Sequence, residues 1–127
     1  MAQSPSPASS SSSPRLTVQA NFWLLADGCS VGGHGRIELL ERIRQSGSIR
    51  QAAIAMGMSY RAAWGAVQTM EKRLGGPLVN RATGGKGGGG ATLSEAGQRL
   101  VDAYRSLEAE HARQVTRLND KLTRLLG

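Results

Sequence analysis

Three short helical patterns follow one another between residues 36 and 76, and each stops at glycine. In the first, RIELLERIRQSG, apolar residues recur at helical spacing and Gly47 follows the last of them. Ile37, Leu40 and Ile43 fall on one face, with Leu39 beside them. The pattern predicts a short amphipathic helix with two further helices directly behind it.

The second and third helices have recognisable starts. In SIRQAAIAMG, Ser48 precedes Gln51 by three residues, the spacing of a capping box, and Gly57 ends the helix. In SYRAAWGAVQTMEKRLG, Ser59 is the expected N-cap and Gly75 the expected stop. The third helix places its apolar residues on one side, namely Ala63, Trp64, Val67, Met70 and Leu74. Two helices joined by so short a glycine turn indicate a helix-turn-helix, although purely structural helix pairs share such turns.

The charge of the chain favours a DNA-binding helix-turn-helix over a purely structural helix pair. The 127 residues carry 16 Lys and Arg against nine Asp and Glu, a net charge of +7 and a pI near 10.8. Residues 36–93 hold nine of the basic residues and three of the acidic ones. Such a balance indicates a polyanionic partner, with nucleic acid ahead of an acidic membrane surface.

Few residues in the chain suit metal or redox chemistry. A single cysteine, Cys29, excludes an intramolecular disulfide and fits a reducing compartment. His34 has no second ligand at metal-binding spacing, so we expect a loop-anchoring or solvated histidine. No nucleophile and base, paired carboxylates or metal cluster can be assembled from the sequence, so we expect no enzyme.

The amino-terminal part reads as a tail followed by a strand. Residues 1–14 are rich in Ser and Pro and predict a disordered tail, without the features of a secretory signal. No later stretch is apolar enough to span a bilayer, so we expect a cytoplasmic protein with no membrane partner. From Leu16 to Leu24 apolar residues alternate, which predicts a half-buried strand, and ADGCSVGGHG is expected to be a loop. The alternating residues are Leu16, Val18, Ala20, Phe22 and Leu24.

A hairpin is expected directly after the third helix. PLVNRAT and ATL are short strand-compatible runs on either side of Gly84 to Gly90, and a hairpin in this position is a wing. A phosphate-binding loop would need Ser or Thr after Lys86 and a helix at once, and neither follows. A merely flexible hairpin tip remains the alternative.

One long helix is predicted from Thr92 to Leu126, with Thr92 and Glu95 as a second capping box. Its apolar positions step by threes and fours, the spacing of a coiled-coil seam that most economically pairs with a second copy. Alternatively, its first half packs on the wing domain and its second half frays. We therefore divide the chain into a tail (1–14), a DNA-binding domain (15–93) and a dimerisation helix (94–127). The seam consists of Leu100, Tyr104, Leu107, His111, Val115, Leu118, Leu122 and Leu125.

Two stretches carry a family resemblance. GSIRQAAIAMGMSYRAAW and LVNRATGGKGGGGATLSEAGQRL closely resemble the amino-terminal DNA-binding domain of the ModE family, the bacterial molybdate-responsive transcriptional regulators. The match runs roughly from Gly35 to Tyr104. The region is similar, more distantly, to the winged helix of LysR-type regulators. The resemblance implies a mainly α fold with a small β component, a winged helix-turn-helix plus a long C-terminal dimerisation helix, and regulation of genes for molybdenum uptake or metabolism.

DNA-binding roles can be assigned to residues on this basis. Arg61 is the expected base contact, and Tyr60 either contacts a base or packs. Trp64 is expected in the core. The start of the second helix is placed to hold phosphate, and the wing adds affinity through its basic residues and its glycine backbone. The full predicted DNA-binding set is Ser48, Arg50, Gln51, Ser59, Tyr60, Arg61, Gln68, Arg81, Gly84, Gly85 and Lys86.

The resemblance covers no segment that would bind molybdate, the effector of the family. ModE proteins usually continue into small β-domains that bind molybdate, so we expect no cofactor in this chain. Two other functions stay open. One is a small molybdate- or oxyanion-binding protein, and the other is a protein-interaction module whose long helix engages a different protein, with DNA binding incidental.

Overall fold

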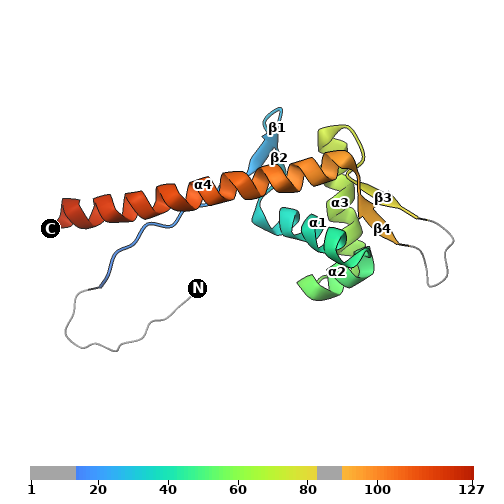
Figure 1. Ribbon diagram of the computed structural model, residues 1–127, viewed down its shortest axis with the longest axis horizontal. Helices are drawn as coiled ribbons and strands as arrows, with labels where there is room; N and C mark the ends of the chain where they lie inside the picture. Colours follow the sequence, from blue (N-terminus) through green and yellow to red (C-terminus); the bar gives the residue numbers. More distant parts are fainter. Residues whose placement is uncertain (1–13, 83–89) are drawn as a thin grey trace.

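The computed structural model describes residues 14–82 and 90–127. These residues form a cluster of three short helices with two small hairpins and one long helix that extends well beyond them (Figure 1). The predicted class, mainly α with a small β component and a winged helix-turn-helix, is confirmed. In chain order the elements are β1 (Leu24–Ala26), β2 (Cys29–Gly32), α1 (His34–Ser46), α2 (Ile49–Met56), α3 (Tyr60–Leu74), β3 (Val79–Arg81), β4 (Ala91–Leu93) and α4 (Glu95–Leu126).

The predicted starts and stops of α2 and α3 are confirmed. Ser48 Oγ accepts a 3.0 Å hydrogen bond from the Gln51 amide, and Ser59 caps α3 in the same way. Both helices end at a glycine in the left-handed region, including Gly57 with φ of 69° in the turn between them. The capping box of α2 differs in one partner, because the Ser48 amide donates to Ser46 Oγ at 3.2 Å.

The core lies between α1, α2, α3, β2, the wing and the first turns of α4. The predicted faces of α1 and α3 are buried there, except that Leu74 is 43 % exposed and Trp64 half-buried. Val101 of α4 is fully buried although the predicted seam leaves it out. The largest fully buried side chains are Ile37, Leu39, Leu40, Ile43, Val67, Met70 and Val101.

The strand predicted from Leu16 to Leu24 is wrong. Residues 14–23 form no strand and run along α4 instead (Figure 1). Asn119 of α4 receives a 2.7 Å hydrogen bond from the Val18 amide and donates one of 3.1 Å to the Val18 carbonyl. Phe22 stacks on Tyr104 with ring centroids 4.9 Å apart. The alternation of apolar residues therefore reflects an extended segment, named the arm here (residues 14–23), with a helix in place of a neighbouring strand.

The loop predicted from residue 26 to residue 35 is also wrong. It contains the turn and second strand of a hairpin, in which β1 pairs antiparallel with β2, and the first turn of α1. Asp27 and Gly28 form the two-residue turn, with φ of 49° and 82°. Positive φ at both central residues matches the hairpin turn that Asp-Gly favours, so the signal was present in the sequence.

The predicted wing is confirmed as the antiparallel pair β3–β4, with Val79 opposite Leu93. At the other end of this pair, the first residue of β4 is fixed to the residue after α1, because the Ala91 amide donates a 2.9 Å hydrogen bond to the Gly47 carbonyl. Gly84, Gly85 and Lys86 lie outside the described residues.

Helix α4 starts later than predicted. Ser94 is its N-cap, accepting from the Gly97 amide at 3.0 Å, while Thr92 lies in β4, so the Thr92–Glu95 capping box is wrong. Gly97 is buried where α4 crosses the residue before β3, and a Cβ built on it would lie 2.3 Å from the Leu78 carbonyl oxygen. Glycine at this position allows the helix to sit directly on the backbone. Across the described residues, no helix is long and apolar enough to cross a membrane.

Candidate nucleic-acid interface

The turn between α2 and α3 brings two exposed helix starts together. Ala52 and Ala53 of α2 are buried, and their small side chains permit close packing of the helices. The Met58 amide donates a 2.9 Å hydrogen bond to the Ala53 carbonyl and closes the turn. Trp64 stands one turn into α3, half-buried between the core and the wing.

The predicted DNA-binding residues in α2 and α3 lie on the outside of this unit. Arg61 follows Tyr60 in the first turn of α3 and is exposed, and Gln68 is exposed about two turns further along the same side. Arg50 and Gln51 are exposed at the start of α2, whereas Ser48 is half-buried. Their positions suit contact with a large partner, and their roles stay predictions.

The wing meets α3 through Arg81. Its Nη2 donates a 2.9 Å hydrogen bond to the Tyr60 hydroxyl, and its guanidinium lies 4.4 Å from the centroid of the Trp64 ring. The guanidinium of Arg50 lies over the other aromatic ring, 5.6 Å from the Tyr60 centroid. The structure thus joins Arg50, Tyr60 and Arg81 into one surface, which we name the α3–wing face together with Arg61 and Trp64.

The contact between Trp64 and Arg81 was missed by sequence reasoning. Tyr60 and Trp64 are four residues apart on a helix, so their rings lie on the same side of it. This spacing is the one part of the contact that the sequence could indicate. The arginine that comes to lie on them is 17 residues beyond Trp64, and its approach depends on the angle of the wing.

The α3–wing face is positive, and within the described residues no acidic side chain pairs with its arginines. Residues 48–93 contain six Lys or Arg and one acidic residue, Glu71. The Glu71 carboxylate turns to the start of the wing, where it accepts hydrogen bonds from the Leu78 and Val79 amides at 2.8 and 3.1 Å. In the described part of the chain, no carboxylate lies within 4.0 Å of the guanidinium of Arg50, Arg61 or Arg81.

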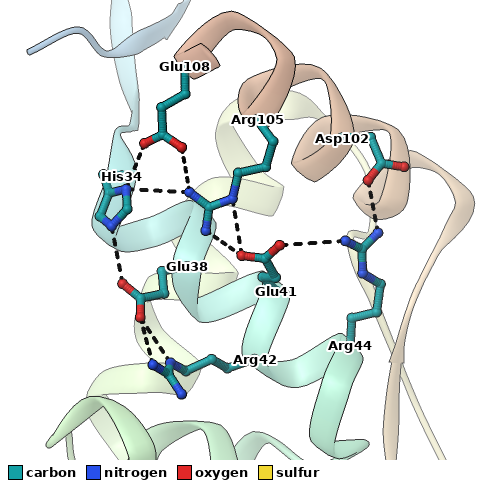
Figure 2. A network of polar contacts seen from close by, with 8 residues as sticks. All are labelled: His34, Glu38, Glu41, Arg42, Arg44, Asp102, Arg105 and Glu108. Atoms are coloured by element: carbon teal, nitrogen blue, oxygen red, sulfur yellow. Dashed lines mark hydrogen bonds and ion pairs between the residues drawn. The ribbon is translucent and has the colours of Figure 1, made fainter. Parts of the chain in front are cut away.

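A second charged cluster joins α1 to α4, and its arginines are all paired (Figure 2). Arg105 donates to Glu41 through Nε at 3.1 Å and to Glu108 through Nη1 at 2.7 Å. Arg44 bridges to Asp102 at 3.1 Å. We name this cluster the α1–α4 junction; its members are His34, Glu38, Glu41, Arg42, Arg44, Asp102, Arg105 and Glu108.

His34 sits between two carboxylates at one edge of the junction. Its Nδ1 lies 2.8 Å from Glu108 and its Nε2 lies 3.3 Å from Glu38. The hydrogen bond from His34, together with Arg105, holds the pKa of Glu108 below its usual value. The hydrogen bond from Arg42 lowers the pKa of Glu38 in the same way. His34 is therefore an exposed anchor at the start of α1, as the sequence predicted in part, although it belongs to a helix rather than to a loop.

The residues of the predicted seam of α4 differ in how far they are exposed. Tyr104 is 2 % exposed and His111 packs edge-on against Phe22, so these two contact their own chain. Tyr104 is buried by its own chain, which corrects its assignment to a dimer surface, whereas His111 is half-buried and its assignment stays a prediction. Leu107, Leu118 and Leu125 are 50, 48 and 71 % exposed. Leu100, Val115 and Leu122 are half-buried.

The three exposed leucines form a straight line with the half-buried Leu100. Leu100, Leu107, Leu118 and Leu125 are separated by steps of 7, 11 and 7 residues, which are close to whole numbers of helical turns. At the domain end of this line, a hollow of about 640 Å³ lies beside Leu100 and is lined by Leu74 and Pro77. We name this line the leucine stripe.

The described residues offer no metal site, since no group of three or more His, Cys, Asp or Glu side chains lies close enough together to hold an ion. Cys29 is exposed in the β1–β2 hairpin.

Comparison with known proteins identifies the helix-turn-helix. Residues 34–98 match the family described as bacterial regulatory helix-turn-helix protein, lysR family. Over 92 residues the chain is 45 % identical to the molybdenum transport protein ModE of Azotobacter vinelandii, covering 72 % of this chain and 34 % of that protein. It is 54 % identical over 69 residues to the DNA-binding transcriptional dual regulator ModE of Escherichia coli, covering 54 % and 26 %.

Solved structures share the fold. The DNA-binding domain of CbnR, determined in a complex with DNA, superposes with a TM-score of 0.57 at 20 % identity, covering 68 % of this chain and 94 % of that one. Full-length LysG of Corynebacterium glutamicum gives a TM-score of 0.52 at 28 % identity, covering 68 % and 28 %. The chain spans about a third of the length of the curated relatives it matches.

Proposed function

Because this chain belongs to the LysR family of bacterial regulatory helix-turn-helix proteins, we propose that it binds double-stranded DNA in the bacterial cytoplasm as a ModE-type transcription regulator. Its targets in this proposal are genes of molybdenum uptake or metabolism, as the names of its relatives suggest. The observation that carries the proposal is the α3–wing face, where arginines from α2, α3 and β3 gather without a carboxylate among the described residues.

In this proposal α3 enters the major groove by its amino end. Arg61 faces outward in the first turn, where a guanidinium can reach the O6 and N7 acceptors of guanine. Arg50 and the wing residue Arg81 flank α3 and hold backbone phosphates, which contribute affinity without sequence preference. Lys86 of the wing tip adds a further charge in the same role.

The protein acts as a homodimer in this proposal, and the leucine stripe is the surface that pairs. Half-exposed leucines along more than six turns of helix are costly in water, and a second copy covers them. Residues 95–110 carry four acidic and two basic residues, whereas 111–126 carry one acidic and four basic residues. Opposite charges of the two halves favour antiparallel pairing, which brings Leu125 of one copy toward Leu100 of the other.

Sedimentation of the purified chain tests the dimer. Wild type is expected to sediment as a dimer, and Leu107→Glu with Leu118→Glu as a folded monomer. A monomeric wild type, or a dimer unaffected by both charges, contradicts the leucine stripe as the pairing surface.

We propose that this chain itself holds no molybdate. Calorimetric titration of the purified protein with molybdate is expected to give no saturable heat. A saturable signal would instead support an oxyanion-binding protein.

Selection of genomic DNA fragments by the purified protein, with and without molybdate, tests the DNA-binding function. Retention of a defined set beside molybdenum-related genes is the expected result. Retention of random fragments would reduce the function to nonspecific binding, and retention of none would overturn it.

A further inference from the structure

Tyr60 joins three elements at the amino end of α3. Its ring lies beneath the Arg50 guanidinium of α2, 5.6 Å away, and its hydroxyl oxygen accepts the 2.9 Å hydrogen bond from Arg81 of β3. The Arg81 guanidinium also lies on Trp64, 4.4 Å from the ring centroid. Helix α3 therefore holds the arginine of the wing on two sides.

Such a hold matters for binding because a long side chain loses conformational freedom when it meets a partner. Arg81 is exposed at the end of β3, where its guanidinium hydrogen-bonds to Tyr60 and lies over Trp64. These two contacts fix the guanidinium before a partner arrives. A guanidinium has five N–H donors, and the hydrogen bond to Tyr60 leaves the others for an anion.

The arrangement of charges points to the kind of anion. Arg50 and Arg81 both bring a positive charge to Tyr60, and like charges repel one another. In the described chain no carboxylate lies within 4.0 Å of either to offset this repulsion. A phosphate beside Tyr60 would offset it, and guanidinium groups bind phosphate in a forked geometry.

We propose that Tyr60 is a positioning residue that holds Arg81 for a phosphate of the DNA backbone, and that Tyr60 does not itself read a base. The inference rests on the proposed function, since it assigns a role within DNA binding. It replaces both roles that the sequence left open for Tyr60, base contact and packing.

The variant Tyr60→Phe tests the inference because it keeps the ring beneath Arg50 and removes only the hydroxyl. Its affinity is compared with those of wild type, Arg81→Ala and the double variant, on a duplex of mixed sequence and on a genomic fragment retained by wild type. With Arg81 present, Tyr60→Phe is expected to weaken binding about tenfold, by the same factor on both duplexes. With Arg81 already replaced by alanine, the expected loss is about twofold or less.

Tyr104→Phe provides the matched control. Its hydroxyl donates to the Phe22 carbonyl at 3.5 Å on the α4 side of the molecule, so the same chemical change there is expected to leave DNA affinity unchanged. Equal losses from Tyr60→Phe in both Arg81 backgrounds would show that Tyr60 acts independently. A loss confined to the retained genomic fragment would show base reading. Either result, or no loss at all, overturns the inference.

A second measurement needs no DNA. The order parameter of the Arg81 Nε–H group, measured by NMR in the free protein, is expected to fall in Tyr60→Phe and to stay the same in Tyr104→Phe. An unchanged value in Tyr60→Phe overturns the positioning role. If wild type binds neither duplex, the proposed function fails, and this measurement still decides whether Tyr60 holds Arg81.

Discussion

The α1–α4 junction and the α3–wing face are both rich in arginine, and they differ in what lies beside it. At the junction, Arg42, Arg44 and Arg105 each lie within 4.0 Å of a carboxylate. On the α3–wing face, the guanidinium groups of Arg50 and Arg81 lie over aromatic rings instead. Arginine therefore pairs with carboxylates in one region, and in the other, among the described residues, it lies against aromatic rings without a carboxylate within 4.0 Å.

The difference separates stability from binding. Paired charges at a surface contribute modestly to folding and project little field outward. Unpaired charges cost some stability through mutual repulsion and attract a polyanion, with an affinity that falls as salt rises. Substitutions in the two regions are therefore expected to change different measurements.

The largest effect is expected from Gly97→Ala, on the α4 side. The new Cβ would lie 2.3 Å from the Leu78 carbonyl oxygen, so either α4 or the wing base must move. We expect a loss of about 3 kcal/mol in the free energy of unfolding, measured by chemical denaturation. The matched control is Gly65→Ala in α3, where a Cβ meets nothing within 4 Å and alanine is expected to stabilise by roughly 0.5 kcal/mol or more. Similar changes in the free energy of unfolding for both variants would contradict the close packing of α4 on the Leu78 backbone.

Arg61→Ala is the corresponding test of the α3–wing face. We expect a loss of roughly 1 to 3 kcal/mol in binding to a selected genomic site, measured by fluorescence anisotropy, because a base contact is removed. Stability is expected to change by less than about 0.5 kcal/mol. A uniform loss on all sequences would make Arg61 a phosphate contact.

Arg105→Gln is expected to give the opposite pattern. It removes the hydrogen bonds to Glu41 and Glu108 across the junction, whose side chains are a quarter to a third exposed. Partial screening limits the expected loss of stability to about 1 kcal/mol. DNA affinity of the folded variant is expected to match wild type. A fall in DNA affinity without a fall in stability would show that the α1–α4 junction also takes part in binding.

The smallest effect concerns pH. The pKa values of Glu38 and Glu108 in the folded protein lie below their usual value of 4.5, because Arg42 and His34 respectively hydrogen-bond to them. Their contribution to stability is therefore present above pH 4.5 and is lost as the pH falls below it. Thermal melting of Glu108→Gln is expected to show a shallower loss of stability with acid than wild type. A steeper loss would contradict the pairing.

The sequence predicted most of the helix-turn-helix because its signals are local. Serine caps, glycine stops and helical spacing depend on neighbouring residues, and α2 and α3 start and end where those signals place them. The start of α4 was misplaced because Thr92 and Ser94 both offer a capping oxygen, and pairing of Thr92 in β4 decides between them.

What escaped prediction depends on contacts between distant residues. The arm has the alternation of a strand, and only the position of α4 shows that Asn119 and Tyr104 take the place of a neighbouring strand. The contacts of Phe22 with Tyr104 and His111 on α4 escaped prediction for the same reason. Likewise, the contact of Arg81 with Tyr60 needs the angle of the wing, which no local pattern encodes.

The hydrogen bonds between Val18 and Asn119 link residues 101 positions apart. During synthesis, a chain growing from its amino end has completed α1, α2, α3 and the wing before Asn119 has been added. The helix-turn-helix can therefore begin to fold on the ribosome before the arm can bind to α4. Closing so long a loop late costs less entropy than closing it in an unfolded chain, because α1, α2 and α3 lie between the two residues and are already folded.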